Sequence, residues 1–248
     1  MEEDRSPVRK FYKLSAVKTS MLAKVVGIIQ ETHDTRTFRL KVDAPFQYIP
    51  GQFIMTCLKG GVSAAGEKLP ARAYSMASAP GEETVDITLN LIPNGKLTPH
   101  LFRLKDGDEL DVKGPFGKFT LDESAKNIVV IAGGTGIAPF RAFWKYLIKK
   151  GHASKLTVLY SAKTKNDIIY KHEIEEIKKA GVKVVVTLTR EDWDGNRGRI
   201  GAEMIKNNVP HLNDSLFYIC ASIEMVKSME ELLHGMGVAK EMIKKEIW

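Results

Sequence analysis

The stretch NIVVIAGGTGIAP at residues 127–139 constrains the fold most, because a strand, a glycine-rich turn and a helix start follow one another in it. Its apolar opening, rich in β-branched residues, is typical of a buried parallel strand. The turn and the helix start present backbone N–H groups and the positive end of a helix to a phosphate. Because glycine has no Cβ, the phosphate can approach the backbone closely. The spacing is not GxGxxG, so a tight turn without a ligand is the alternative. The residues predicted to hold a phosphate are Gly133, Gly134, Thr135, Gly136 and Pro139.

Different patterns precede and follow this stretch. From residue 23 to about residue 124, short strand-like runs are separated by turn residues, which favours a closed antiparallel β-barrel. From residue 127 onward, strand-like and helix-like runs alternate, which indicates βαβ units on a parallel sheet. We therefore predict an antiparallel β-barrel domain at 23–124 and a parallel-sheet α/β domain at 125–248. Residues 1–22 are predicted to be an N-terminal extension, disordered or loosely packed.

The composition excludes several classes of protein. The two cysteines, Cys57 and Cys220, are too few for a disulfide framework or an iron–sulfur cluster. The six histidines lack metal-ligand spacing, so no metal site is predicted. No apolar run reaches the roughly 20 residues that span a bilayer, and no apolar signal-peptide segment is found near the N-terminus. We therefore expect a cytoplasmic protein without a transmembrane segment.

The net charge of +7, from 37 basic and 30 acidic residues, leaves several interpretations open. Nucleic-acid binding is disfavoured, because the charge is dispersed and no nucleic-acid-binding motif is present. A basic face that steers an acidic protein or a phosphorylated cofactor fits the charge equally well. The remaining alternative is a merely solvated basic surface.

Two motifs in the barrel half, Arg72-Ala73-Tyr74-Ser75 and the later turn Gly95-Lys96-Leu97-Thr98, resemble the flavin-binding signature of the ferredoxin–NADP reductase superfamily. Alternate strand residues face the same side, so Arg72 and Tyr74 can both face a flavin. The resemblance implies that Arg72 binds the diphosphate, Tyr74 stacks on the isoalloxazine and Ser75 reaches the flavin N5 edge through a strand bend. The turn would offer N–H groups and the Thr98 hydroxyl to the pyrophosphate of FAD. The alternative is that Arg72 is a surface charge and Tyr74 a core aromatic. The remaining FAD contacts implied by the resemblance are Ala73, Asn90, Leu91, Ile92, Gly95, Lys96 and Leu97.

In the second half, GGTGIAP matches the phosphate turn of the same family, and Tyr160-Ser161-Ala162 ends the next strand, where the family contacts the nucleotide. Cys220 ends a later strand, where the family places a cysteine beside the nicotinamide. The family usually continues with Gly-Pro after this cysteine, whereas this chain has Ala221-Ser222. The alternative is that Cys220 is a plain buried strand residue.

The chain ends in Glu246-Ile247-Trp248, which is similar to the Glu-x-aromatic end of plant-type ferredoxin–NADP reductases. This likeness implies that Trp248 stacks on the isoalloxazine as a gate for the nicotinamide and that Glu246 lies in the nicotinamide pocket. The alternative is that Trp248 packs at the end of the last strand.

The loop after the third strand of this half bears on the choice of nucleotide. Thr189-Arg190 resembles the Ser-Arg pair that binds the 2′-phosphate in NADP-using members, and Arg199 follows it. Basic groups here favour NADPH and acidic groups favour NADH. We predict NADPH, with NADH use possible; the alternative is that these are solvated loop charges.

The resemblance implies an FAD-dependent NAD(P)H oxidoreductase that transfers hydride between nicotinamide and flavin. Ser75 and Glu246 would assist the hydrogen-bond network around N5, and Cys220 would position the nicotinamide. Because no iron–sulfur site is present, the one-electron carrier would be a separate acidic protein, a ferredoxin or a flavodoxin. The alternatives are a reductase component of an oxygenase or of a larger redox complex, and a non-catalytic flavin or nucleotide sensor.

Overall fold

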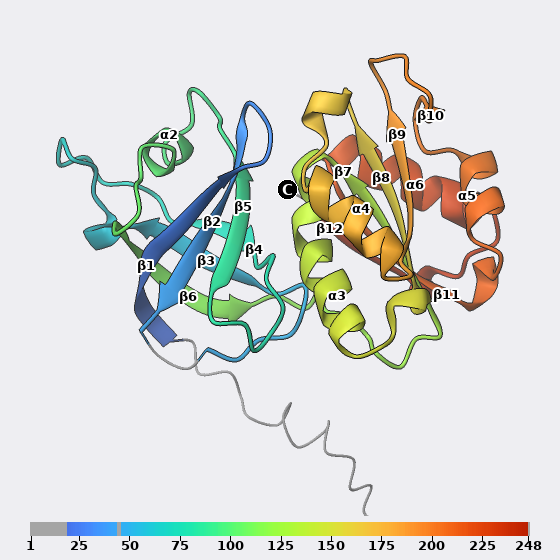
Figure 1. Ribbon diagram of the computed structural model, residues 1–248, viewed down its shortest axis with the longest axis horizontal. Helices are drawn as coiled ribbons and strands as arrows, with labels where there is room; N and C mark the ends of the chain where they lie inside the picture. The colour runs from blue at the N-terminus through green and yellow to red at the C-terminus, as the bar shows by residue number, and fades with distance from the viewer. Residues whose placement is uncertain (1–18, 44–45, 248) are drawn as a thin grey trace, which may run out of the picture.

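Two six-stranded sheets organise the residues that this computed structural model describes, 19–43 and 46–247 (Figure 1). The first sheet is antiparallel throughout, in the order β4-β3-β6-β1-β2-β5. The second is parallel throughout, in the order β10-β9-β8-β7-β11-β12. The predicted fold class, an antiparallel flavin-type domain followed by a parallel-sheet α/β domain, is therefore confirmed.

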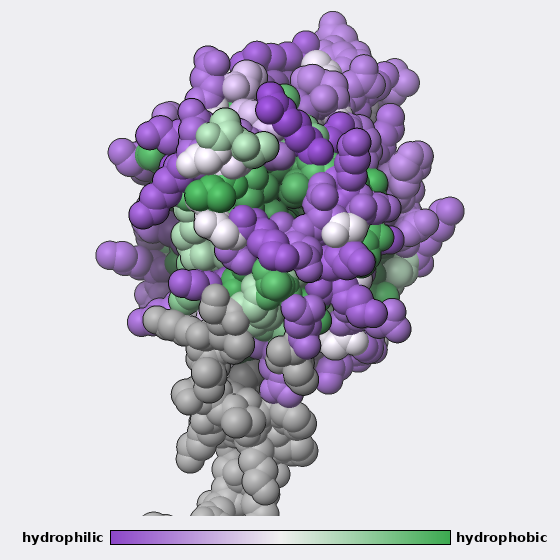
Figure 2. All heavy atoms as spheres, turned by 90° about the vertical axis from the view of Figure 1, so that its left-hand side faces the viewer, coloured by the Kyte–Doolittle hydropathy of each residue, from purple (hydrophilic) through white to green (hydrophobic). Residues whose placement is uncertain are grey.

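The first sheet curls on itself, because its edge strands β4 and β5 meet through a bridge between Met76 and Ile87. Apolar side chains fill its interior, and Figure 2 shows the outer side of this domain as mostly hydrophilic, with apolar residues gathered in the middle of the face. β1 pairs with β6 from Thr19 onward, so the first strand starts before the predicted domain start at residue 23. The elements are β1 Thr19–Gln30, β2 Thr35–Val42, β3 Phe53–Leu58, β4 Arg72–Ser75, β5 Val85–Asn90, α2 Thr98–Leu101 and β6 Glu109–Phe116.

β5 is buried on both faces. Val85, Ile87 and Leu89 belong to the barrel core. Asp86 and Thr88 have the opposite parity, and they bond to side chains of the second domain. Strands of an antiparallel barrel commonly keep one face in water, so this second domain covers what would otherwise be a solvated face.

Helices cover both faces of the second sheet. Along β7, Ile128, Val130 and Ala132 pack in one apolar cluster with α3 and α4, and Val129 and Ile131 pack in another with α5 and α6. This alternation explains the continuous apolar run of the central strand. The elements are β7 Asn127–Gly133, α3 Ala138–Lys149, β8 Leu156–Ala162, α4 Lys171–Lys179, β9 Lys183–Leu188, β10 Asn196–Arg197, α5 Ala202–Asn208, β11 Ser215–Ala221, α6 Ile223–Gly235 and β12 Ile243–Ile247.

Two of the predictions fall wholly or mainly outside this description. Trp248 is not among the described residues, and of the predicted extension only residues 19–22, which begin β1, are described. The boundary predicted between residues 124 and 125 lies in the connection from β6 to β7 and stays a prediction. Within the described ranges, no helix has both the length and the apolar character that crossing a membrane requires. In that same part of the chain, no cluster of His, Cys, Asp and Glu is suited to holding a metal ion.

Candidate active site

Ser75, Cys220 and Glu246 come together where the two domains meet. Ser75 ends β4 of the barrel, and Cys220 and Glu246 are register neighbours on β11 and β12 of the parallel sheet. The Ser75 Oγ donates a hydrogen bond to Glu246 Oε2 at 3.5 Å, across 171 residues of sequence. β12 is the edge strand of its sheet and faces the barrel, which brings these groups into reach (Figure 1).

Burial changes the acid–base properties of both groups on the parallel sheet. Desolvation raises the pKa of Glu246 to about 7, and the Ser75 hydrogen bond offsets only part of this. Among the described residues, no ion pair of Glu246 compensates for its burial. The Cys220 thiol is 2% exposed, and its pKa is raised mainly by this burial and, to a smaller extent, by the neighbouring Glu246 charge. The thiol is therefore neutral at physiological pH and is not an activated nucleophile.

The β4 side chains offer groups that suit a flavin nucleotide. Arg72 is exposed, and among the described residues its one hydrogen bond runs to the carbonyl oxygen of its neighbour Ala71, at 3.3 Å. Tyr74 is half-buried against the barrel core, and desolvation raises its pKa to about 12 despite the nearby Arg72 charge. An exposed guanidinium with spare donors next to an aromatic ring on the same strand face fits a diphosphate and an isoalloxazine ring. Ala73, between them, is exposed.

The turn after β5 differs from the expected phosphate contact. The Thr98 hydroxyl accepts a hydrogen bond from Ile92 N at 3.0 Å and lies 3.2 Å from Ile92 O, to which it donates. The Thr98 hydroxyl is thus engaged in closing its own turn. Leu97 is buried in the barrel core, whereas the Lys96 side chain is exposed. The other predicted contacts of this region lie at the end of β5 (Asn90) and in the turn itself (Leu91, Ile92, Gly95), all at least partly exposed.

The turn between β7 and α3 follows the predicted order of strand, glycine turn and helix. At one of its glycines, packing inside the protein, and not a ligand, accounts for the missing side chain. A Cβ at Gly133 would lie 2.7 Å from the Met225 sulfur and 3.3 Å from Ala221 Cβ, so packing within the protein favours glycine there and a larger residue would require Met225 to move. Gly134 adopts a positive φ of 53°, which glycine tolerates best. Gly134 and Thr135 are half-buried at the strand end, Gly136 is buried, and Pro139 lies in the first turn of α3.

The neighbouring strand end places one predicted contact in the core. Tyr160 has no exposed surface, and its hydroxyl accepts a hydrogen bond from Ile169 N at 3.3 Å. Its parity on β8 matches that of Val158 and Ala162 in the same apolar cluster, so its side chain does not face the sheet end. Ser161, of opposite parity, is half-buried.

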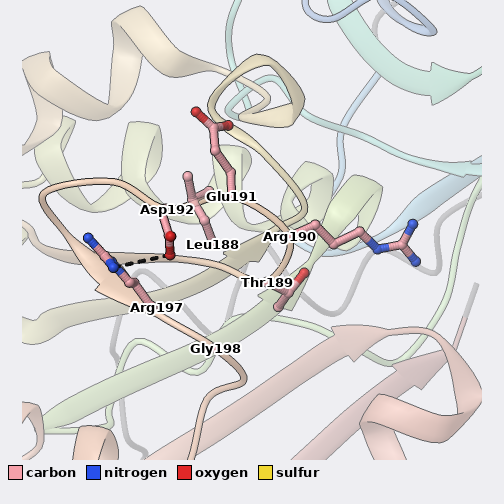
Figure 3. Close-up of a pocket in the computed structure, with 7 residues that line it drawn as sticks. All are labelled: Leu188, Thr189, Arg190, Glu191, Asp192, Arg197 and Gly198. Atoms are coloured by element: carbon pink, nitrogen blue, oxygen red, sulfur yellow. Dashed lines mark hydrogen bonds and ion pairs between the residues drawn. The ribbon is translucent and has the colours of Figure 1, made fainter.

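A hollow of about 340 Å³ lies between the end of β9 and β10 (Figure 3). Thr189 and Arg190 line it, and the Arg190 side chain extends away from the acidic residues (Figure 3). Among the described residues, the Arg190 guanidinium has no acidic partner. Arg197 also lines the hollow and pairs with Asp192 at 3.1 Å, whereas the predicted Arg199 is exposed outside the lining.

The acidic members of this hollow were not predicted. Glu191 accepts a hydrogen bond from Lys165 N at 2.7 Å, and Asp192 is held by Arg197. The run Asp-Trp-Asp-Gly-Asn-Arg at residues 192–197 could have indicated the Asp192–Arg197 pair, because a short loop with a glycine can bring its two ends close together.

Known protein families divide the chain in the same way. The family described as "Oxidoreductase FAD-binding domain" matches residues 22–121, and the one described as "Oxidoreductase NAD-binding domain" matches residues 130–231. Among solved structures, the FAD/NAD-binding domain of a nitric oxide dioxygenase from Vibrio cholerae superposes with a TM-score of 0.84 over 92% of this chain and 98% of that chain. Its sequence identity of 22% makes this a likeness of fold alone.

Two curated relatives are more similar in sequence. Ferredoxin–NADP reductase B of Sorangium cellulosum is 32% identical over 192 residues, which cover 71% of this chain and 77% of the relative. The glycine betaine monooxygenase reductase subunit of Pseudomonas aeruginosa PAO1 is 30% identical over 227 residues, covering 87% of this chain. The matched region spans only 61% of that second relative.

Proposed function

Because this chain belongs to the ferredoxin–NADP reductase superfamily of FAD- and NAD(P)-binding oxidoreductases, we propose that it transfers hydride between a nicotinamide nucleotide and FAD and exchanges single electrons with a separate protein. A single observation carries this proposal: the Ser75 hydroxyl from the flavin-type barrel meets the Glu246 carboxyl, beside Cys220, from the nucleotide-type domain. Bound FAD would supply the hydride acceptor and the one-electron chemistry.

The residues of the barrel fit this cofactor. Arg72 would hold the diphosphate through its unused guanidinium donors, and the Tyr74 ring would pack against the isoalloxazine. The Thr98 hydroxyl is occupied within its own turn, so the turn would contribute backbone groups and the Lys96 side chain instead.

The interdomain residues would manage protons and orientation. With a pKa of about 7, the Glu246 carboxyl is available in both protonation states at physiological pH, so Glu246 Oε2 and Ser75 Oγ can pass a proton between them. The neutral Cys220 thiol is 2% exposed beside Glu246, so it would shape the nicotinamide pocket from beneath, without covalent chemistry. Trp248 is proposed as a gate on the resemblance of the Glu246-Ile247-Trp248 motif alone.

NADPH is the proposed nucleotide, with NADH as a weaker substrate. Arg190 lines the hollow after β9 with its guanidinium unpaired among the described residues. The charges of Glu191 and Asp192 are already engaged by Lys165 N and Arg197. Two arginines and two acidic residues line the hollow, so its formal charge is zero, and it is the Arg190 guanidinium donors that suit a 2′-phosphate better than a 2′-hydroxyl.

The proposed electron partner is an acidic ferredoxin or flavodoxin. Residues 125–248 contain 20 basic and 14 acidic residues, whereas residues 23–124 contain 12 and 13. The excess positive charge therefore belongs to the nucleotide-binding side, where an acidic carrier would be steered. The second candidate is the reductase component of an oxygenase, which the monooxygenase reductase subunit among the relatives favours. Reduced protein that is reoxidised only by an oxygenase component would support that candidate.

An anaerobic absorbance spectrum tests the proposal directly. The purified protein, reconstituted with FAD if necessary, is expected to show a flavin spectrum that bleaches on adding one equivalent of NADPH, and more slowly with NADH. A flavin spectrum that neither nucleotide bleaches would favour the sensor alternative. A protein that binds no FAD would contradict the assignment of the Arg72–Ser75 strand.

A further inference from the structure

A buried ionic cluster apart from the site above joins the two domains. Its centre is Arg141, in the first turn of α3. The Arg141 residue is 2% exposed. The Arg141 guanidinium donates to Asp86 Oδ2 at 2.8 Å and to Ala77 O at 3.2 Å, both in the barrel. Its Nε lies 2.9 and 2.8 Å from the two carboxylate oxygens of Glu173 in α4. One side chain thus bridges two domains and two helices.

Tyr170 adds a second set of contacts across the same boundary. Its hydroxyl donates to the Thr88 hydroxyl, and its backbone N–H donates to Glu31 Oε2 at 3.2 Å. Its ring lies 5.1 Å from the Arg141 guanidinium carbon. Tyr170 has a φ of 58°, a left-handed conformation that non-glycine residues rarely adopt. Such a conformation persists where surrounding contacts determine it, which indicates that this junction is well defined.

Arg141 lies near both halves of the candidate active site: its barrel contact, Ala77, is close to Ser75 in sequence, and its own helix, α3, follows the glycine turn. Ala77 follows Ser75 by two residues, and its N–H is held by Asp86 O at 2.7 Å. α3 begins directly after the glycine turn at 133–137, which is the proposed nucleotide phosphate site. The guanidinium therefore links β5 and the segment directly after β4, the strand that Ser75 ends, to the helix that follows this turn.

We propose that Arg141 is a positioning residue for hydride transfer, setting the separation between the flavin strand β4 and the nucleotide-binding turn. This inference rests on the proposed function. A buried ion pair is by itself weak evidence for stability, whereas its fixed, forked geometry can specify one arrangement of the two domains. Hydride transfer is sensitive to this arrangement, because a misplacement of about 1 Å can lower a rate by about 100-fold.

The test replaces Arg141 by lysine, which keeps the positive charge but lacks the forked guanidinium that bonds several acceptors at once. Arg141→Lys is expected to keep its FAD, to bind NADPH within about twofold of the wild type, and to bleach roughly 10- to 100-fold more slowly at saturating NADPH. The matched control is Lys145→Met, one turn further along α3. Lys145 also crosses the boundary, to Glu82 at 2.8 Å, but both side chains are partly exposed, so bleaching within about twofold of the wild type is expected.

Hydrogen exchange of the FAD-bound, nucleotide-free protein gives a readout independent of turnover. Peptides covering residues 72–78 and 134–141 are expected to exchange faster together in Arg141→Lys and to be unchanged in Lys145→Met. If Arg141→Lys does not fold, Asp86→Asn, which removes the interdomain ion pair but keeps a side-chain oxygen as acceptor for Arg141, is expected to show the same slower bleaching and faster exchange.

A folded Arg141→Lys protein, or Asp86→Asn in its place, with wild-type bleaching and wild-type exchange would overturn the proposal. Failure of the proposed function looks different, because the wild type itself would then not bleach with either nucleotide. The exchange measurement would still decide whether Arg141 couples β4 to the glycine turn.

Discussion

At the scale of single residues, Glu246 depends most on where the fold places it. In sequence it is one acidic residue in the run KKEIW. In the structure it lies between two domains, half-buried, with the Ser75 hydroxyl as its partner. Desolvation then moves its pKa from 4.5 to about 7, which makes a proton donor of a residue that is ordinarily ionised.

We expect carbon-13 NMR of the purified protein, labelled at its glutamate carboxyls, to show one carboxyl titrating near pH 7. That signal should be missing in Glu246→Gln. The sign for stability follows from the raised pKa: the protonated form is favoured by folding, so this contribution is complete below about pH 4.5 and is lost as the pH rises through about 7. A Glu246 carboxyl that titrates near pH 4.5 would contradict the assignment.

At the scale of elements, the segment after β9 places two arginines in different surroundings, two and nine residues after the end of that strand. Arg190 lines the hollow without an acidic partner among the described residues. Arg197 lines it too, but Asp192 and the Trp193 carbonyl oxygen already hold its guanidinium. The chain thus offers an internal comparison between a free and an occupied guanidinium.

Arg190→Ala is therefore expected to raise the KM for NADPH by roughly 10- to 100-fold, since charge-assisted hydrogen bonds contribute about 1.5–3 kcal/mol. The KM for NADH, which lacks the 2′-phosphate, should change by less than about threefold. Arg197→Ala serves as the control, with a smaller effect on NADPH. Steady-state kinetics with both nucleotides decide the matter, and an equal loss for NADPH and NADH would count against a 2′-phosphate contact.

At the scale of the whole molecule, charge and domain arrangement are the properties that matter. The excess of basic residues belongs to residues 125–248, while the flavin-type barrel at 23–124 is nearly balanced. Long-range steering of an acidic carrier would therefore act mainly through the second domain. The two domains also share buried contacts, from Arg141 to Asp86 and from Tyr170 to Thr88, which fix how the domains sit against each other.

Electron transfer from the reduced protein to an acidic ferredoxin should slow at least about tenfold between roughly 20 and 300 mM salt, because the Debye length shortens severalfold over this range. Reduction of an uncharged small acceptor, measured in the same salt series, is the control and should change little. Salt-independent transfer to ferredoxin would argue against an acidic partner.

The sequence alone predicted the two-domain fold, because each domain rests on local patterns. Short turn-separated strands indicated the barrel, and the run of β7 followed by a glycine turn indicated the parallel sheet. The burial of Arg141 could also have been predicted, since it lies three residues before Trp144 and therefore on the buried, apolar face of α3. Its role could not, because Asp86 and Glu173 lie 55 and 32 residues away in sequence.

The amino-acid sequence by itself determined which motifs this protein has and in what order its domains come, because hydrophobic periodicity and turn chemistry act over a few residues. Only the tertiary structure decided what each side chain faces. It placed Tyr160 in the core and committed the Thr98 hydroxyl to its own turn, although both had been predicted to face cofactors. It also brought Ser75 to Glu246 across 171 residues and buried Asp86 under the second domain. Burial, pKa and hydrogen-bond partners depend on packing between segments far apart in the chain, and that packing exists only once both domains have folded against each other.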